Sequence, residues 1–190
     1  VGNGGASSTA TDGVAGVALL DRAHIFADNG GTIILTGTPG TPAAGGAIQN
    51  GVVLNSVGSL PGVRVRAGGD GGSITITGLP ATGTTLDHNA NGVVLQGAGT
   101  LVEATGNATI SINGKGSDTS IQNGSAFTNG LLMFDGAQVK SAAGAITITG
   151  TAGLTTNTAR DATGIVIGDG TAISTVDGAI QITGTGGGTP

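Results

Sequence analysis

The chain has 190 residues, of which 40 are Gly, 37% are hydrophobic and 2% are aromatic, and its net charge is −5. This apolar content is too high for a disordered chain, and Gly lacks the three-residue period of collagen, so both classes are excluded. Only six Lys and Arg are present, without Trp or Tyr, and no apolar run reaches 18 residues, so we expect neither a nucleic-acid partner nor membrane insertion. The length indicates a single domain over residues 1–190.

The first predicted element is a short aliphatic strand that follows a glycine. It recurs five times, from Gly16-Val17-Ala18-Leu19 to Gly164-Ile165-Val166-Ile167, and the copies begin near residues 16, 51, 92, 130 and 164. If Val52 and Leu54 point inward, period-two alternation turns the middle column outward. That column is entirely apolar and predicts an interface, covered either by the chain's own loops or by a neighbour. It consists of Ala18, Val53, Val94, Leu132 and Val166.

The second and third predicted strands complete each copy. The second is typified by Val65-Arg66-Ala67, and the third by Ile146-Thr147-Ile148-Thr149-Gly150. In the third strand the aliphatic residues alternate with polar ones, which indicates one buried and one outward face. An outward polar ladder is therefore predicted along the copies. It consists of Thr36, Thr77, Asn113, Thr149 and Thr183.

A single copy cannot bury its own aliphatic face, whereas stacked copies can. The sequence therefore predicts an all-β fold: a right-handed parallel β-helix of about five coils, each with three strands. Glycines are expected to supply the bends at the corners. The segments 38–50, 79–91, 115–129 and 151–163 predict a ribbon of mobile loops along one edge, and Asn55 to Gly62 enlarges the second coil. Residues 1–5 and 186–190 are expected in loops, which leaves both ends of the stack uncapped.

Candidate catalytic and metal-binding residues are scattered. Asp70, Asp135, Asp169 and Asp177 each precede a glycine, which is typical of tight turns. Gly68 to Ile74 resembles one glycine-rich calcium repeat but occurs once. His24 and His88 are isolated, whereas a zinc site needs three or four ligands. The absence of Cys removes thiolate chemistry. We therefore expect no enzyme, no cofactor and no metal site.

The order Gly-Val-x-Leu, Val-x-Ala and Ile-x-Ile-Thr-Gly resembles the β-helical repeats of filamentous-haemagglutinin-like proteins, autotransporter passengers and bacterial β-strand-repeat surface proteins. The resemblance covers about Gly16 to Gly184. It implies secretion to the bacterial cell surface and a structural or adhesive role, with no catalytic residues. We expect coils to stack end to end with copies of the chain or adjoining repeats. Three alternatives stay open: glycan binding by the edge loops, ice binding by the polar ladder, and action on polysaccharides.

Overall fold

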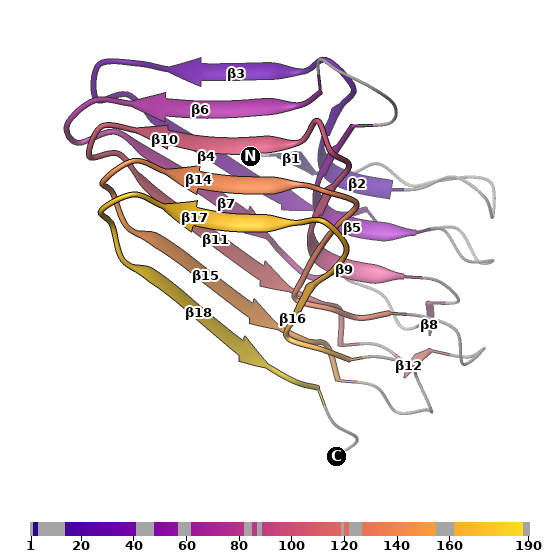
Figure 1. The fold of residues 1–190 in the computed structure, drawn as a ribbon. Coiled ribbons are helices and arrows are strands. Elements are labelled where there is room, and N and C mark those ends of the chain that lie inside the picture. The colour runs from indigo at the N-terminus through magenta and orange to yellow at the C-terminus, as the bar shows by residue number, and fades with distance from the viewer. Residues whose placement is uncertain are drawn as a thin grey trace.

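The computed structural model describes residues 2–3, 14–40, 48–56, 62–81, 85–86, 89–118, 120–121, 127–154 and 162–187. Within these ranges every regular element is a β-strand, and the strands of each sheet pair in parallel. Three sheets wrap around one interior (Figure 1). The all-β parallel solenoid predicted from the repeat is therefore confirmed.

The chain passes through the three sheets in turn, so that each coil contributes one strand to each sheet. The first sheet consists of β2 (Val14–Leu20), β5 (Gln49–Asn55), β9 (Ala90–Gln96), β13 (Leu131–Phe134) and β16 (Ile165–Ile167). The second sheet consists of β3 (His24–Ala27), β6 (Arg64–Gly68), β10 (Leu101–Thr105), β14 (Gln138–Ser141) and β17 (Ala172–Thr175). The third sheet consists of β1 (Gly2–Asn3), β4 (Thr32–Thr38), β7 (Ser73–Gly78), β11 (Thr109–Lys115), β15 (Ile146–Thr151) and β18 (Ile180–Thr185).

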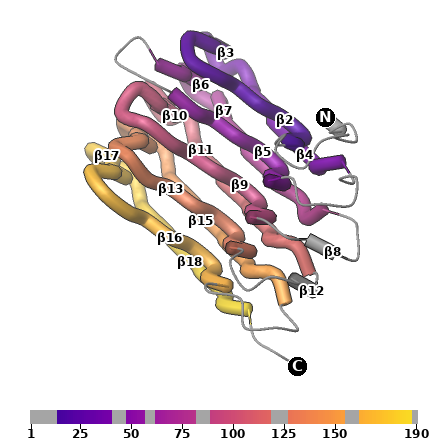
Figure 2. Tube along the Cα trace, turned by 90° about the vertical axis from the view of Figure 1, so that its right-hand side faces the viewer, coloured from indigo at the N-terminus to yellow at the C-terminus, as the bar shows by residue number. Residues whose placement is uncertain are grey.

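Equivalent residues of successive coils lie directly opposite one another. Ile110 pairs with Ile74 on one side and Ile146 on the other, and Leu95 lies between Leu54 and Met133. Figure 2 shows the resulting levels, with β2, β5, β9, β13 and β16 side by side. Because a shift of one residue would turn every aliphatic side chain to the opposite face, the buried face fixes this register.

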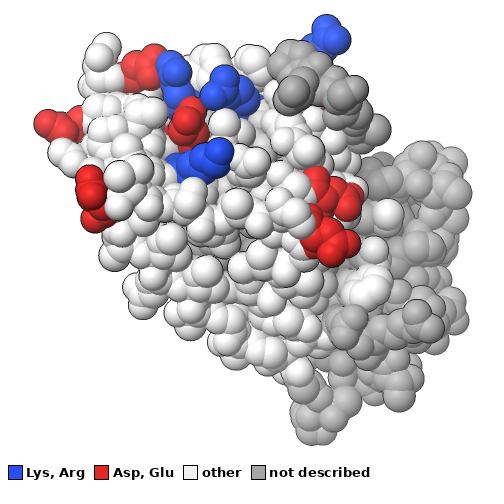
Figure 3. All heavy atoms as spheres, in the orientation of Figure 1, with Lys and Arg blue, Asp and Glu red and all other residues white. Residues whose placement is uncertain are grey.

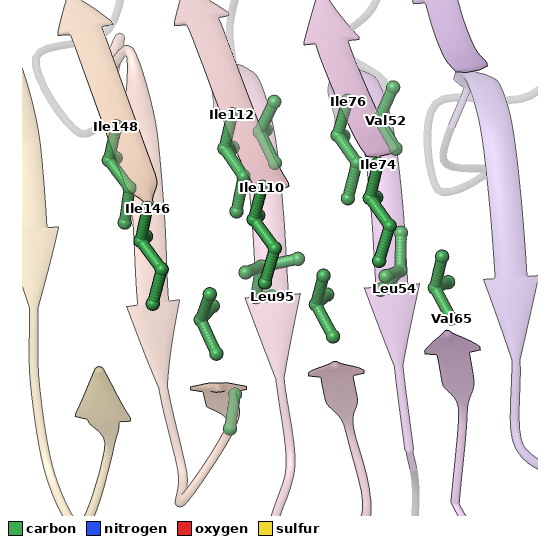
Figure 4. Close-up of a cluster of buried hydrophobic side chains, with 14 of the residues drawn as sticks. Val52, Leu54, Val65, Ile74, Ile76, Leu95, Ile110, Ile112, Ile146 and Ile148 are labelled. Carbon is green, nitrogen blue, oxygen red and sulfur yellow. The ribbon is translucent and has the colours of Figure 1, made fainter. Parts of the chain in front are cut away.

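The core is a set of aliphatic columns without aromatic rings. In β7, β11 and β15 the side chains alternate between buried and half-exposed, and the Ile side chains at the buried positions are 0–1% exposed. Figure 4 shows these Ile side chains beside Val52, Leu54 and Leu95 of the first sheet, with Val65 of the second sheet nearby. Full burial of each such side chain stabilises the fold by about 1.5–3 kcal/mol.

Two columns of glycine bring the first and third sheets into backbone contact. A Cβ atom on Gly78 would overlap the carbonyl oxygen of Gly92, and one on Gly51 would lie 2.6 Å from the Cα of Gly78. We call these columns the glycine seam. It consists of Gly37, Gly78, Gly114 and Gly150 on the third sheet and Gly16, Gly51, Gly92, Gly130 and Gly164 on the first.

The glycines of the seam have a different role from the glycines of the bends, since none of the opening and closing glycines has a positive φ. They are needed because no side chain fits between the two sheets. The bends lie at the other corners, where Asp135 and Gly136 have φ values of 56° and 81°. The interpretation of Asp-Gly pairs as turns is thus correct at this position.

The N-terminal end differs from prediction. Residues 1–5 were expected in a loop, but Gly2 and Asn3 form β1 and pair with Gly37 and Thr38 of β4. Gly2 therefore continues the column of closing glycines beyond Gly37. The prediction failed because the segment has the closing glycine of the third strand without its Ile-x-Ile.

The predicted loops are shorter than expected where the structure describes them. Gln49, Asn50, Ala90 and Asn91 already belong to β5 and β9, and Lys115 still belongs to β11. A small additional sheet pairs β8 (Thr85–Leu86) with β12 (Ser120–Ile121) in parallel. The mobility of the predicted ribbon is not tested, and parts of it lie outside the described residues, as do residues 57–61 of the second-coil expansion. These parts are residues 41–47, 82–84, 87–88, 119, 122–126 and 155–161.

Candidate functional site

The predicted apolar stripe of the first sheet forms one aligned column. Ala18, Val53 and Val94 are consecutive register partners, as are Val94, Leu132 and Val166. The neighbouring Val52 and Leu54 are fully buried, so the stripe faces outward. Its role as an interface stays a prediction.

Part of this stripe is covered by the chain itself. Val94 is only 6% exposed, and both faces of β9 are buried. Next to it, Phe127 and Asn89 join Leu132, Val166 and Asn129 around a hollow of about 190 Å³. Ala18 is exposed, whereas Val94 is buried. The exposed apolar stripe is therefore interrupted at the level of Val94.

The predicted polar ladder also forms one column. Thr36 pairs with Thr77, Thr77 with Asn113, Asn113 with Thr149, and Thr149 with Thr183. The first four are half-exposed and Thr183 is exposed. A second outward column, at Thr75, Ser111 and Thr147, lies two residues earlier on the same strands. The outer face of the third sheet thus carries two columns rich in hydroxyl and methyl groups, which Ile34, Asn113 and Gln181 interrupt.

A ladder of asparagines, which the sequence analysis missed, lies at the start of the first sheet. The side-chain Nδ2 of Asn91 donates to Oδ1 of Asn50 at 3.1 Å. Oδ1 of Asn91 accepts from the backbone N–H of Asn129 at 3.2 Å, and Oδ1 of Asn129 accepts from that of Thr163 at 3.1 Å. Asn91 and Asn129 are buried, so these bonds satisfy groups that water does not reach. An Asn before the opening glycine in three copies was the available signal.

Charged groups gather on the outer face of the second sheet, over its first levels (Figure 3). Arg66 contacts Asp28 at 3.0 Å and lies over the ring of Phe26, 4.9 Å from its centroid. Arg64 contacts Glu103 at 3.2 Å. These side chains are partly exposed, and exposed ion pairs typically contribute about 0–1 kcal/mol. The positive and negative side chains of the cluster pair with one another, so the cluster does not offer a ligand a surface of one charge.

The candidate catalytic and metal-binding residues lie apart from one another. Asp70 accepts a hydrogen bond from Asn107 at 2.8 Å, and Asp135 accepts one from Gln96 at 3.0 Å. His24 lies 3.2 Å from the carbonyl oxygen of Gly62, whereas His88 lies outside the described residues. Within the described ranges, no three His, Asp or Glu side chains come together as metal ligands. Asp70, Asp135 and His24 thus each contact a neighbouring coil.

The C-terminal level exposes the side chains that the inner levels bury. Ile180 and Ile182 are 42% and 44% exposed, whereas the equivalent Ile146 and Ile148 are 0% exposed. A hollow of about 510 Å³ opens there, lined by Ile165, Ile182 and Gly184, among others. This end of the solenoid is thus an open concavity lined mostly by apolar atoms.

The stacked sheets and the in-register columns define the chain as a parallel β-solenoid repeat protein. Comparison with protein families, curated proteins and solved structures finds no match. In the described part of the chain, no helix has the length and apolarity needed to span a bilayer.

Proposed function

We propose that the chain is a structural or adhesive segment of an extracellular fibre, extended by further coils that stack on its C-terminal face. The observation that carries the proposal is the exposure of Ile180 and Ile182, at 42% and 44%. Inside the solenoid, the same positions are sealed by the next coil. A further coil on β18 would therefore complete a core that this level leaves half open.

The backbone of the last level supports the same conclusion. β18 pairs with β15 on one side, and no described strand lies on its other side. The outer edges of β16 and β17 are equally without a described partner. Open edges of N–H and C=O groups favour pairing with another strand. Three such edges at one level form a surface that matches one coil.

Placement outside the cell rests on the sequence. The order of strand motifs resembles filamentous-haemagglutinin-like and autotransporter repeats, which are surface proteins of bacteria. The chain also has no Cys, which is compatible with export in an unfolded state. These features support a secreted fibre component with a structural or adhesive role.

The test is the association state of the purified chain. We expect light scattering to show growth with concentration, and electron microscopy to show elongated particles. The matched variants are Ile182→Lys, which places a charge on the open face, and Ile34→Lys, which places one on an outward position that is already 63% exposed. Ile182→Lys should abolish growth and Ile34→Lys should leave it unchanged. A wild-type chain that stays monomeric up to millimolar concentration contradicts the proposal.

Ice binding is a second candidate function, favoured by the hydroxyl array of the third sheet. Along β11, β15 and β18, the outward positions repeat about every 4.8 Å between strands and about every 6.7 Å along them. The array contains few charges; Lys115 is one. Thermal hysteresis measures this activity directly. Thr149→Lys should abolish hysteresis and Lys140→Thr, on the second sheet, should not change it; a wild-type chain without hysteresis removes the candidate.

A further inference from the structure

The hollow on the outer face of the first sheet has the features of a small-molecule site. Its volume is about 190 Å³, and it is lined by Asn89, Phe127, Asn129, Leu132 and Val166. We propose that it binds a small neutral compound with an aromatic or short aliphatic body and one hydrogen-bond acceptor, such as a carbonyl oxygen. The proposal is independent of the proposed stacking function, because it concerns the side of the solenoid and not its ends.

The hollow lies beside inner levels of the stack. Asn89 directly precedes β9, and Phe127, Asn129 and Leu132 belong to the level of β13. β9 and β13 each have a described strand on both sides. Val166 belongs to the last described level, where it is the half-exposed register partner of Leu132. Four of the five lining residues are thus held by levels whose structure does not depend on an end of the chain.

Three apolar side chains determine the body of the ligand. Leu132 and Val166 are neighbours in the outward column of the sheet, and Phe127 adds an aromatic ring. None of the described residues that line the hollow is ionisable, so a charged ligand would lose hydration without gaining an ion partner. Apolar cavities of about 150 Å³ are large enough for a molecule the size of benzene. The hollow therefore fits a neutral molecule the size of one aromatic ring or a short aliphatic chain.

Two asparagine side chains determine the polar group of the ligand. Oδ1 of Asn89 accepts from the backbone N–H of Phe127 at 3.1 Å, and Oδ1 of Asn129 accepts from that of Thr163 at 3.1 Å. Because a backbone N–H can only donate, these bonds fix which end of each amide is the oxygen. In the described part of the chain neither Nδ2 has an acceptor, although Asn129 is only 1% exposed. An acceptor on a ligand in the hollow would satisfy the donor of Asn129, which is otherwise costly to leave unpaired.

The segment that carries Phe127 and Asn129 is held in place before a ligand binds. The backbone N–H of Ala90 donates to the carbonyl oxygen of Phe127 at 2.8 Å, and that of Gly92 donates to the carbonyl oxygen of Asn129 at 3.0 Å. Oδ1 of Asn91 accepts from the backbone N–H of Asn129 at 3.2 Å. Because the aromatic ring and the donor sit on a tethered segment, binding requires little further ordering of the chain.

Acetophenone is a suitable probe, because it combines one aromatic ring with one carbonyl acceptor. We expect it to bind with a dissociation constant of about 1 mM or lower, an ordinary affinity for a ligand of this size. In proton–nitrogen NMR spectra of the chain, the side-chain amide resonance of Asn129 should shift as acetophenone is added. A chain that does not bind acetophenone, or that binds it without this shift, overturns the proposal.

Val166→Phe tests the place of binding. The larger side chain fills the hollow from a half-exposed position in a strand, where Phe is well accepted, so the chain should fold. The affinity for acetophenone should fall about tenfold or more, because the ring occupies the space of the ligand. Thr147→Phe is the matched control, since it adds the same ring on the outer face of the third sheet and should leave the affinity unchanged. Retained binding in Val166→Phe, or an equal loss in both variants, contradicts binding in the hollow.

Asn129→Asp tests the donor. The carboxylate keeps an acceptor for the Thr163 N–H and removes Nδ2, so the affinity for acetophenone should fall about three- to tenfold. Asn113→Asp, on the outer face of the third sheet, makes the same change of charge and should have no effect. Wild-type affinity in a folded Asn129→Asp chain overturns the proposal. If this variant does not fold, the amide shift of Asn129 in the wild-type chain and the loss of binding in Val166→Phe decide the question.

Discussion

β15 and β18 have nearly the same sequence, Ile-Thr-Ile-Thr-Gly-Thr and Ile-Gln-Ile-Thr-Gly-Thr, and the same place in the coil. Yet the two isoleucines of β15 are fully buried and those of β18 are 42% and 44% exposed. The difference comes from the neighbouring level, because β15 has a strand on both sides and β18 has one on a single side within the described structure. In a solenoid, the contribution of a residue thus depends on its level as much as on its identity.

The largest expected difference between an inner level and the last one is at the buried aliphatic column. Ile112→Asp places an unpaired charge in the core and should unfold the chain or truncate the stack. Ile182→Asp can reach water and should leave a folded chain. Urea unfolding monitored by circular dichroism distinguishes the two. Equal losses of stability would mean that the last level is as closed as the inner ones.

The glycine seam gives the second comparison. Gly78→Ala forces a methyl group onto the carbonyl of Gly92 and should destabilise the chain by about 1–3 kcal/mol or more, as overpacking does. Gly184→Ala meets no atom closer than 3.6 Å and should change the free energy of unfolding by less than about 1 kcal/mol. If Gly78→Ala is as stable as wild type, the two sheets are not in backbone contact.

A smaller effect is expected at the asparagine ladder. Asn129→Ala removes the acceptor of the Thr163 N–H inside the fold and should cost about 1–3 kcal/mol. Asn113→Ala is the control, because Asn113 lies on the outer face and its side chain bonds only to Ser111 among the described residues. The free energies of unfolding of the two variants provide the measurement. A cost at Asn113 equal to that at Asn129 would contradict a structural role of the ladder.

The smallest effect concerns Asp118. The side chain of Lys115 donates a hydrogen bond to it at 2.8 Å, and the backbone N–H of Leu154 donates another at 3.1 Å, which lower the pKa of Asp118. A lowered pKa in the folded state adds stability at pH values above the usual Asp range, and this is lost as pH falls through the lowered pKa. Lys115→Ala should raise the pKa of Asp118 in an NMR titration. An unchanged titration would show that the pair is not formed in solution.

The repeat made the fold predictable, because five copies of each strand place identical columns in register. Asp135-Gly136 and the outward position of Val94 also followed from local patterns. The burial of Val94 did not, since the alternation along its strand predicts an exposed side chain at this position. β1 was not predicted because a glycine beside one aliphatic residue shows no alternation of apolar and polar side chains. Its strand conformation depends on pairing with β4. The asparagine ladder was not predicted because Asn-Gly is typical of turns. Only the stacked structure shows that the side chains of Asn50, Asn91 and Asn129 form hydrogen bonds with one another or with the backbone of the next level.

The glycine seam has a consequence for how such a chain can vary. Because the seam closes the aliphatic core at one corner, Pro39, Gln49, Ser117 and Thr128 lie beyond it, away from the Ile columns. Gln49, Ser117 and Thr128 are nonetheless only 0–1% exposed. The seam thereby separates two buried regions of different chemistry, one aliphatic and one polar, and substitutions in the two regions should change the free energy of unfolding independently.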